Sequence, residues 1–237
     1  MFLLALDTCD ARGGVAVLRD SELVVSATHP RDEEYSSWLI PAADQVLESA
    51  SLTHADLEGY AVASGPGSFT GVRVGLTTVK AWSEAFAKPI ASVSRLEALA
   101  SSAAAPGDFV AAFIDAQRSQ LFGGLYRLHH GRSLQLVEDE VVAPPAAFLE
   151  WVLGQAGTQR VAWISMDPQI LTGLEGWEQR AALGECVETF PGELAPRIGL
   201  LGFRQLASGR ATDSLKLDAN YVRRSDAELF WKKSASS

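Results

Sequence analysis

Gly65-Pro66-Gly67-Ser68-Phe69-Thr70-Gly71 is the stretch that decides the fold, because it joins an apolar strand-like segment, 60–64, to a helix-like segment, 70–87. Its glycines lift the Cβ restriction on positive φ, and its proline holds its own φ at about −65°. Ser68 or Thr70 can cap the first free amides of the helix. The sequence therefore predicts a stiff turn from strand to helix at the centre of the protein's role.

A phosphate-binding turn is the first functional interpretation of this motif, because glycine-rich turns from strand to helix aim free N–H groups and a positive helix end at anions. The spacing argues against it. A P-loop has four residues between its glycines, followed by Lys and Ser or Thr, whereas five residues separate Gly65 from Gly71 and Val72-Arg73 follows. In the dinucleotide-binding pattern the third glycine would fall on Thr70. We therefore favour a packing role for the turn over an anion site.

The helix expected after the turn has one face that carries almost no side chain. Gly71 and Gly75 stand four residues apart, and Thr78 and Trp82 continue the same row. A glycine in an exposed helix interior costs about 1 kcal/mol relative to alanine, so a close contact should compensate for the two glycines. Two interpretations are open: the row packs closely inside its own domain, or it admits a helix of a partner.

Four stretches of the chain resemble proteins of the TsaB (YeaZ-type) family. They are Leu3-Leu4-Ala5-Leu6-Asp7-Thr8 at the start, residues 65–76 in the middle, Ile114-Asp115-Ala116-Gln117 in the second half, and Tyr221-Val222-Arg223-Arg224 followed by Trp231-Lys232-Lys233 near the end. The similarity runs from about residue 3 to residue 233 and is weak over 130–210. The central motif is long enough to be specific.

The resemblance implies a bacterial subunit of the machinery that places threonylcarbamoyl on the adenosine next to the anticodon of ANN-decoding tRNAs. It implies a non-catalytic subunit, a pseudo-enzyme, that binds and activates the paralogous catalytic protein TsaD as a heterodimer through its N-terminal lobe. TsaE, an ATPase, joins the larger complex, and a TsaC-type enzyme acts separately.

The subunit would meet tRNA indirectly, and it could form a homodimer (a dimer of two copies) when alone. No cofactor is expected in the isolated chain, and ATP with Mg²⁺ is expected, if at all, in the assembled complex. The residues expected at the partner surface are Trp38, Pro41, Gly65, Pro66, Gly67, Ser68, Phe69, Thr70, Gly71, Gly75, Thr78 and Trp82.

Length, composition and cysteine use limit the class of protein. A chain of 237 residues with 47% apolar residues suits two modest domains with buried cores. Its apolar runs are far shorter than the roughly 20 residues that cross a bilayer, and no signal-peptide pattern precedes the first strand, so we expect a cytoplasmic protein without membrane attachment. Cys9 and Cys186 form no C-x-x-C pair, which indicates reduced structural thiols.

The net charge of −9 argues against RNA binding by this chain alone, because an autonomous RNA binder usually shows a basic face. The exception is a local cluster near the end, formed by Arg223, Arg224, Lys232 and Lys233, with Tyr221 and Trp231 beside it. We interpret this cluster as a solvated C-terminal tail, with contact to RNA as the alternative.

One pattern of elements is written twice along the chain. Strands are expected at 2–7, 14–19 and 22–28, and again at 109–115, 120–128 and 133–142, with His130-Gly131 at a turn of the second set. Helices alternating with single strands follow each set, at 35–50, 60–64, 70–87, 90–93 and 95–104 and, more weakly, at 145–153, 160–164, 175–183, 186–188 and 195–208.

This duplicated β-β-β-α-β-α-β-α order is the α/β topology of the two-lobe actin, hexokinase and Hsp70 superfamily, also called the ASKHA fold. We place the N-terminal ASKHA lobe, with the turn motif and the partner surface, at 1–106. A smaller and less regular C-terminal lobe is expected at 107–237, with a tail that can pack back.

Asp7 and Asp115 end the first strand of each half, where nucleotide-binding members of that superfamily place an aspartate that holds hydrated Mg²⁺ and phosphates. The glycines after Asp7 come late, and the stretch 115–120 has none. We therefore assign Asp7, Thr8 and Asp115 to a vestigial nucleotide cleft, with strand-end caps as the simpler interpretation of the two aspartates.

The alternative function is that of an enzyme. The chain would then be an ATP-dependent phosphotransferase or a glycoprotease-like hydrolase of the same superfamily. Catalytic family members carry an H-x-x-x-H metal-binding pair, and His29, His54, His129 and His130 make no such spacing. Tyr35 stands where TsaB relatives often have a histidine. The sequence predicts no catalytic residue and no metal site.

Overall fold

The structure is a computed structural model that describes residues 1–129, 133–220 and 222. Its described residues divide into two compact units: unit 1 consists of Met1–Ala98 and Pro191–Asn220, and unit 2 of Leu99–Phe190. The expected boundary between 106 and 107 had left 191–220 in the C-terminal lobe. The structure groups this segment with unit 1, because its helix packs on the first sheet. The predicted His130-Gly131 turn and the basic cluster of the tail lie outside the described residues.

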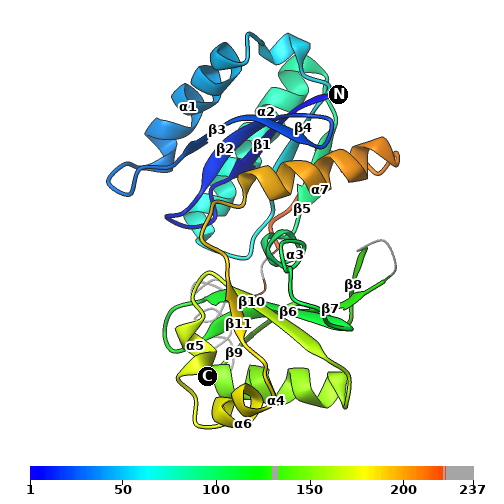
Figure 1. Cartoon of the computed structure of the whole chain (residues 1–237). Coiled ribbons are helices and arrows are strands. Elements are labelled where there is room, and N and C mark those ends of the chain that lie inside the picture. Colours follow the sequence, from blue (N-terminus) through cyan, green and yellow to red (C-terminus); the bar gives the residue numbers. More distant parts are fainter. Residues whose placement is uncertain (130–132, 221, 223–237) are drawn as a thin grey trace, which may run out of the picture. The chain divides into compact units, whose positions relative to one another are not determined.

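Unit 1 is built on a five-stranded sheet with the strand order β3-β2-β1-β4-β5 (Figure 1). Its strands, in chain order, are β1 (Phe2–Asp7), β2 (Gly14–Arg19), β3 (Glu22–Thr28), β4 (Gly59–Ala63) and β5 (Ile90–Val93). The first three form an antiparallel meander, and β1, β4 and β5 run parallel. The predicted meander is confirmed with its bounds, because short apolar runs separated by tight turns mark it clearly.

Helices cover both faces of this sheet. The helices of unit 1 are α1 (Tyr35–Ser49), α2 (Phe69–Phe86), the first part of α3 (Arg95–Ala100) and α7 (Ala195–Ala207). A 3-10 turn, η1, lies at His54–Asp56. The sheet offers α7 a row of alanines that are in register across four strands, namely Ala16, Ala5, Ala61 and Ala91. Gly199 and Gly202 of α7 lie against this row, so small residues on both sides let helix and sheet come close. On β4 the next residue, Val62, points to the opposite face, where α2 lies.

The buried residues of α1 and α2 follow the spacing of an amphipathic helix. In α1 they are Leu39, Ala42, Ala43, Val46 and Leu47, and in α2 they include Val72, Leu76 and Val79. The two helices contact each other, α1 also contacts β2 and β3, and α2 contacts β1, β4 and β5. The opposite stripe of each helix therefore remains on the surface of unit 1.

Unit 2 repeats the plan on a six-stranded sheet with the order β11-β10-β6-β7-β8, in which β9 also pairs with β7. Its elements are β6 (Phe109–Asp115), β7 (Leu121–Leu128), β8 (Leu134–Leu136), β9 (Val141–Ala143), α4 (Pro145–Ala156), β10 (Val161–Ser165), α5 (Gln169–Thr172), α6 (Trp177–Ala182) and β11 (Val187–Thr189). The single strand predicted at 133–142 is wrong: the acidic run Glu138-Asp139-Glu140 interrupts it, and two short strands pair separately with β7. Phe113, Phe148 and Trp163 are fully buried in the core of unit 2.

Within the described residues, no helix combines the length and the apolar composition that a membrane span requires.

Candidate functional site

The turn of the central motif is fixed by hydrogen bonds inside unit 1. Ser68 is the N-cap of α2, and its side chain accepts a hydrogen bond from the N–H of Gly71 at 3.3 Å. The N–H of Ser68 donates to the carbonyl oxygen of Cys9 at 2.7 Å. Two N–H groups that a phosphate would need are thus already occupied, which favours the packing role over an anion site.

The glycines of the motif serve close approach more than unusual backbone angles. Gly65 alone among them has a positive φ, +110°, and so it alone uses the backbone freedom that the missing Cβ gives. An added Cβ at Gly67 would overlap the carbonyl oxygen of Cys9. The loop after β1 therefore lies directly on the turn.

The row of glycines on α2 is filled by Thr8. An added Cβ at Gly71 would overlap the carbonyl oxygen of Thr8, and one at Gly75 would overlap its hydroxyl oxygen. The Thr8 hydroxyl donates to the carbonyl oxygen of Gly71 at 2.7 Å. Of the two interpretations of the glycine row, these contacts favour close packing inside the domain at Gly71 and Gly75, because Thr8 of the same domain occupies that space. Trp82, from the same row, lies against Tyr60, with ring centroids 5.8 Å apart.

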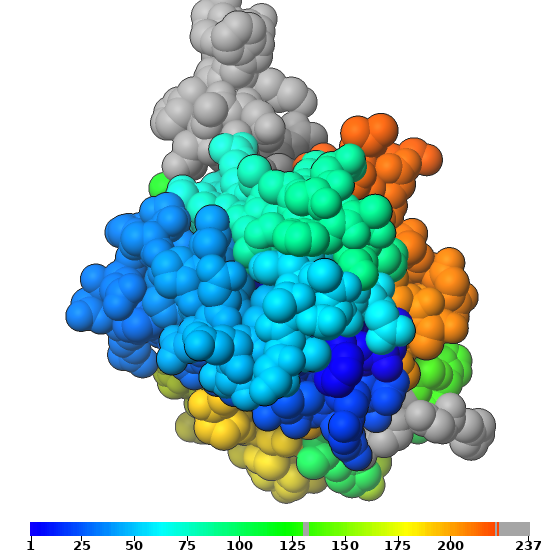
Figure 2. All heavy atoms as spheres, turned by 90° about the horizontal axis from the view of Figure 1, so that it is seen from above, coloured from blue at the N-terminus to red at the C-terminus, as the bar shows by residue number. Residues whose placement is uncertain are grey.

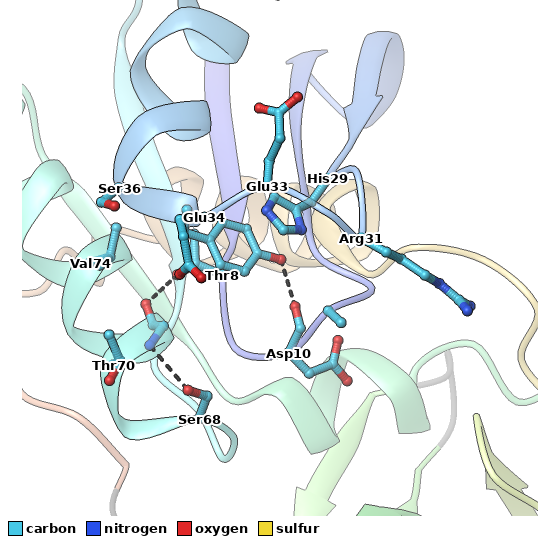
Figure 3. A pocket seen from close by; sticks show the side chains of 13 residues that line it. Thr8, Asp10, His29, Arg31, Glu33, Glu34, Ser36, Ser68, Thr70 and Val74 are labelled. Atoms are coloured by element: carbon cyan, nitrogen blue, oxygen red, sulfur yellow. Dashed lines mark hydrogen bonds between the residues drawn. The ribbon is translucent and has the colours of Figure 1, made fainter.

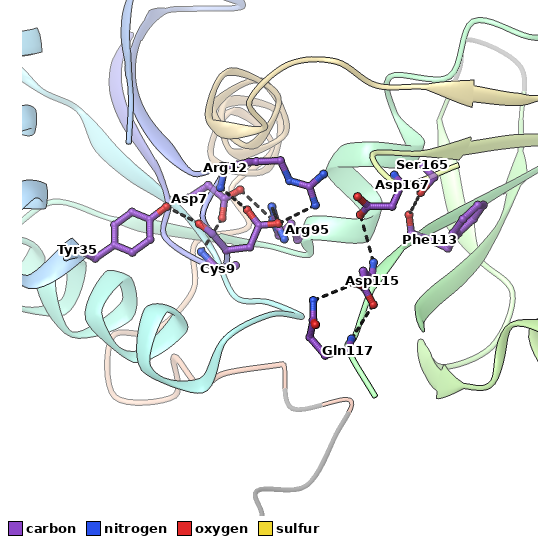
Figure 4. Close-up of polar contacts among 11 residues, drawn as sticks. Asp7, Cys9, Arg12, Tyr35, Arg95, Phe113, Asp115, Gln117, Ser165 and Asp167 are labelled. Carbon is purple, nitrogen blue, oxygen red and sulfur yellow. Dashed lines mark hydrogen bonds and ion pairs between the residues drawn. The ribbon is translucent and has the colours of Figure 1, made fainter. Parts of the chain in front are cut away.

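An ion-pair cluster lies at the end of β1, in which Asp7 and Arg95 are buried and Asp10 and Arg12 are partly exposed (Figure 4). The Nε of Arg95 donates to Oδ2 of Asp7 at 3.0 Å, and its Nη2 lies 2.6 Å from Oδ2 of Asp10. The other oxygen of Asp7, Oδ1, accepts a hydrogen bond from the N–H of Cys9 at 2.9 Å. Arg12 adds a contact to Asp10 at 3.3 Å. The two carboxylates and two guanidinium groups therefore balance in charge.

Burial and charge shift the pKa values of this cluster in consistent directions. Burial acts to raise the pKa of Asp10, but the charge and hydrogen bond of Arg95 outweigh it, and the pKa lies below its ordinary value. Burial acts to lower the pKa of Arg95. The charges of Asp7 and Asp10 raise it by more than burial lowers it, so the pKa of Arg95 lies above its ordinary value. Burial, and then the charge of Asp7, raise the pKa of the Cys9 thiol well above its ordinary value. Cys9 is therefore protonated at neutral pH and is not a thiolate nucleophile.

The lowered pKa of Asp10 predicts a loss of stability in acid. The stabilisation that the Asp10 carboxylate provides should be complete above its unfolded pKa of about 4 and should be lost as the pH falls through the lower folded value. We expect Asp10→Asn to lower the stability of unit 1 by about 1–2 kcal/mol at pH 7, with a smaller difference from the wild type below about pH 4. Hydrogen exchange of the β1 amides would measure this difference in stability. Asp32→Asn, at an exposed position, is the control. A difference that stays constant down to pH 3 would contradict the assignment.

Tyr35 supports the same loop from α1. Its hydroxyl donates to the carbonyl oxygen of Asp10 at 2.6 Å (Figure 4). Its ring stacks on His29, with ring centroids 3.8 Å apart. Burial, and then the charges of Asp7 and Asp10, raise the pKa of Tyr35 well above its ordinary value, so the hydroxyl stays a neutral donor. Tyr35 thus has a structural role in this chain.

Two adjoining hollows lie on the surface of unit 1 beside these loops. The loop pocket, of about 250 Å³, is lined by Thr8, Asp10, Ala11, His29, Arg31, Glu33, Glu34, Tyr35, Ser36, Ser68, Thr70, Gly71 and Val74 (Figure 3). The α1–α2 groove, of about 480 Å³, is lined by Ser36, Thr70, Arg73, Val74, Thr77 and Thr78. Figure 2 views unit 1 with the blue atoms of α1 beside the turquoise atoms of α2. Hydroxyl groups dominate the groove, and Arg73 is its charged residue, which suits a recognition surface better than a catalytic site.

The remaining residues expected at the partner surface lie around this groove or on α1. Ser68 and Thr70 are exposed at the start of α2, Phe69 is half-buried, and Gly65 and Pro66 are buried. On α1, Pro41 is exposed, while the half-buried Trp38 packs edge-on against His29 and Tyr35. Thr70 and Thr78, both expected at the partner surface, line the groove, whereas its residues Arg73, Val74 and Thr77 were not among those predicted from the sequence.

Asp115, the predicted counterpart of Asp7, is an exposed residue of unit 2. Its side chain accepts hydrogen bonds from the backbone N–H of Gln117 at 2.7 Å and from Nε2 of Gln117 at 2.9 Å. Its own N–H donates to Asp167 at 3.4 Å. These contacts fit the interpretation of Asp115 as a cap of its strand end.

Metal-binding geometry is missing from the part of the chain that the structure describes. Within residues 1–129, 133–220 and 222, no three His, Cys, Asp or Glu side chains come together in a way that could hold a metal ion. His54 instead contacts the hydroxyl of Tyr60 at 3.0 Å and stacks on Phe86. Burial raises the pKa of Tyr60 to about 12.

Sequence comparisons place this chain among tRNA-modification proteins. The family model of TsaD, the tRNA N6-adenosine threonylcarbamoyltransferase, matches residues 27–164. The chain is 34% identical to the tRNA threonylcarbamoyladenosine biosynthesis protein TsaB of Bacillus subtilis over 142 residues, 60% of this chain and 62% of that protein. It is 30% identical to TsaB of Escherichia coli over 176 residues, 69% of this chain and 74% of that protein. The match thus spans less than two thirds of the Bacillus subtilis relative.

Solved structures agree with these matches along most of the chain. A protein of Pseudomonas aeruginosa with similarity to the peptidase YeaZ superposes with a TM-score of 0.73 at 26% identity, covering 94% of this chain and 99% of that one. The ADPNP-bound activator of a 2-hydroxyisocaproyl-CoA dehydratase from Clostridium difficile has a TM-score of 0.52 at 8% identity, covering 89% of this chain and 97% of that one, which shows the fold alone. The predicted actin-like α/β fold class is thereby confirmed.

Proposed function

This chain belongs to the TsaB family of tRNA threonylcarbamoyladenosine biosynthesis proteins, and from that membership we propose that it is a non-catalytic subunit that binds and activates TsaD. TsaD would carry out the transfer of threonylcarbamoyl to adenosine next to the anticodon of ANN-decoding tRNAs. The chain would act in the cytoplasm, would meet tRNA through its partners, and would take part in a larger complex with TsaE. Any ATP and Mg²⁺ would belong to that complex.

The chemistry of unit 1 supports a non-catalytic role. Asp7, the residue best placed to act as a base or a metal ligand, is fully buried and paired with Arg95. The Cys9 thiol is buried beside it and its raised pKa keeps it protonated. The hydroxyls of Thr8 and Tyr35 donate to backbone carbonyl groups. The contacts of these side chains are made within unit 1, where they stabilise the loop after β1.

The observation that carries the proposal is the exposed α1–α2 groove, which rests on the rigid turn. Thr70, Arg73 and Thr77 are exposed along one stripe of α2, whereas the opposite stripe is buried in the domain. On α1, Ile40 is 52% exposed and lies one helical turn from Ser36, which lines the groove. A partner helix can lie in such a groove with its apolar face against Ile40 and Val74. A second copy of the chain could use the same face in a homodimer, and would then compete with TsaD.

Reconstitution with purified proteins tests the function. We expect this chain alone to form no threonylcarbamoyladenosine on tRNA, because Asp7 is paired with Arg95 and the Cys9 thiol is held protonated. Adding it to TsaD, TsaE, ATP, tRNA and a source of threonylcarbamoyl-adenylate should raise product formation at least about tenfold over the mixture without it, as expected when a partner stabilises the active state of an enzyme.

Product made by this chain alone would contradict the non-catalytic role and would favour an enzyme of the same superfamily. Tight calorimetric binding of ATP and Mg²⁺ to the lone chain, with a Kd of about 1 µM or below, would point to a phosphotransferase. A mixture whose rate does not depend on the chain would contradict activation of TsaD.

A further inference from the structure

Two carboxylates of unit 1 converge on one guanidinium group. Arg95 contacts Asp7 at 3.0 Å and Asp10 at 2.6 Å, and the side chains of Arg95 and Asp7 are 1% and 0% exposed. Carboxylates that converge in this way are the ligands that hard divalent cations prefer. A buried carboxylate with no positive charge beside it strongly destabilises the folded protein. Such a carboxylate would therefore attract a cation. In this chain a side chain of the protein occupies the position between the two carboxylates.

The guanidinium is held firmly in that position. Arg95 is the first residue of α3, and its N–H donates to the carbonyl oxygen of Gly65 at 2.7 Å. Its backbone is thereby fixed to the turn of the central motif, while its side chain is fixed to the loop after β1. The same loop meets the turn a second time, through the hydrogen bond from the N–H of Ser68 to Cys9. Arg95 therefore links the ends of β1, β4 and β5.

The cluster also lacks the excess negative charge that a metal ion needs. Arg12 brings a second positive charge to Asp10 at 3.3 Å, so that two carboxylates face two guanidinium groups. A divalent cation would have to displace Arg95 from a buried pair, and the displaced guanidinium would then itself be left without a partner.

We propose that Arg95 is a resident counterion that closes the end of β1 to divalent cations, and to the phosphate groups that such cations carry. Unit 1 thus holds its turn and its α1–α2 groove in place without a metal ion. This inference concerns the chain by itself and does not depend on the activation of TsaD.

A titration of the purified full chain with MnCl₂, followed by the electron paramagnetic resonance signal of free Mn²⁺, tests the proposal. The wild type and Asp10→Asn should bind Mn²⁺ alike, within about twofold. Although the Asp10 side chain is 25% exposed, its Oδ1 accepts the N–H of Arg12 at 2.7 Å and its Oδ2 contacts Arg95 and Arg12, so neither oxygen is left for the ion. Arg95→Ala should gain one site at least about tenfold tighter than any site of the wild type, and the double variant with Asp10→Asn should lose that gain. Arg12→Ala is the matched control, since it also removes an arginine from Asp10 but keeps Arg95, and it should gain no site.

Two results would overturn the proposal. One is a wild-type Mn²⁺ site that Asp10→Asn weakens, which would mean that the carboxylates accept a cation beside Arg95. The other is a folded Arg95→Ala chain that gains no site. If Arg95→Ala does not fold without metal, its refolding with MnCl₂ but not with NaCl of equal ionic strength would support the proposal, and the comparison of the wild type with Asp10→Asn would still be able to refute it.

Discussion

Gly71→Ala is expected to destabilise unit 1 by about 3 kcal/mol, a large effect for a single added methyl group. In most helix interiors the change from glycine to alanine is favourable by up to about 1 kcal/mol. At Gly71 the new Cβ would overlap the carbonyl oxygen of Thr8. Backbone atoms cannot rotate away, so α2 must shift or the loop after β1 must move, and overpacking of this kind costs about 1–3 kcal/mol or more. Hydrogen exchange of the amides of β1 and β4 would measure the loss within unit 1.

Gly154→Ala is the matched control for this prediction. Gly154 lies in α4 of unit 2, and nothing lies within 4 Å of an added Cβ there. We therefore expect Gly154→Ala to leave unit 1 unchanged and to stabilise unit 2 by up to about 1 kcal/mol. If Gly71→Ala were as stable as the wild type, Thr8 would not pack on α2 as described, and the glycine row would again be available to a partner.

Thr77→Trp is expected to weaken the binding of TsaD about a hundredfold while unit 1 keeps its stability. Thr77 is exposed and lines the α1–α2 groove, so an indole there meets no atom of the core but fills the groove. A closely packed interface cannot absorb such a volume at its centre, and a loss of about 2–3 kcal/mol in binding free energy is typical of central positions. Calorimetric titration of TsaD with the variant gives the affinity, and a melting curve of the variant alone checks the fold.

Thr172→Trp, at an exposed position of α5 in unit 2, is the matched control, because it adds the same side chain away from the groove. It should bind TsaD as the wild type does. Normal binding by Thr77→Trp would show that the partner surface lies elsewhere. Loss of binding by both variants would implicate unit 2 as well. Sedimentation of the same proteins would reveal whether a homodimer uses the groove.

Most of the fold could be predicted from periodicity and turn residues. The meander of β1, β2 and β3 was predicted with its bounds, and α1 and α2 within one residue at each end, because each element carries a strong local pattern. The interval 133–142 was less predictable. Its apolar residues are interrupted by Glu138-Asp139-Glu140, and such a pattern is compatible with one strand or with two. The return of 191–220 to unit 1 leaves no local sign in the sequence, since it depends on the row of alanines that receives α7.

The candidate site could be predicted only in part. The motif identified the rigid turn and its Ser68 cap. It left the function of Gly71 and Gly75 open between packing and partner binding, because a helix pattern shows that a face is bare but not which atoms lie against it. Here they belong to Thr8, which is 63 residues from Gly71 in the chain. Arg95 was missed for the same reason, since 88 residues separate it from Asp7.

The sequence by itself determined the duplicated order of strands and helices, the stiff turn and the family resemblance, since these depend on residues that are neighbours in the chain. The tertiary structure alone decided which charges neutralise each other, which face of α2 is closed and where a groove remains. The physical reason is that burial and ion pairing depend on distances between residues that the chain separates widely, and a one-dimensional pattern contains no such distances. Asp7, which could hold a metal ion if it were open to solvent, is a structural residue in this chain because folding brings Arg95 to within 3.0 Å of it.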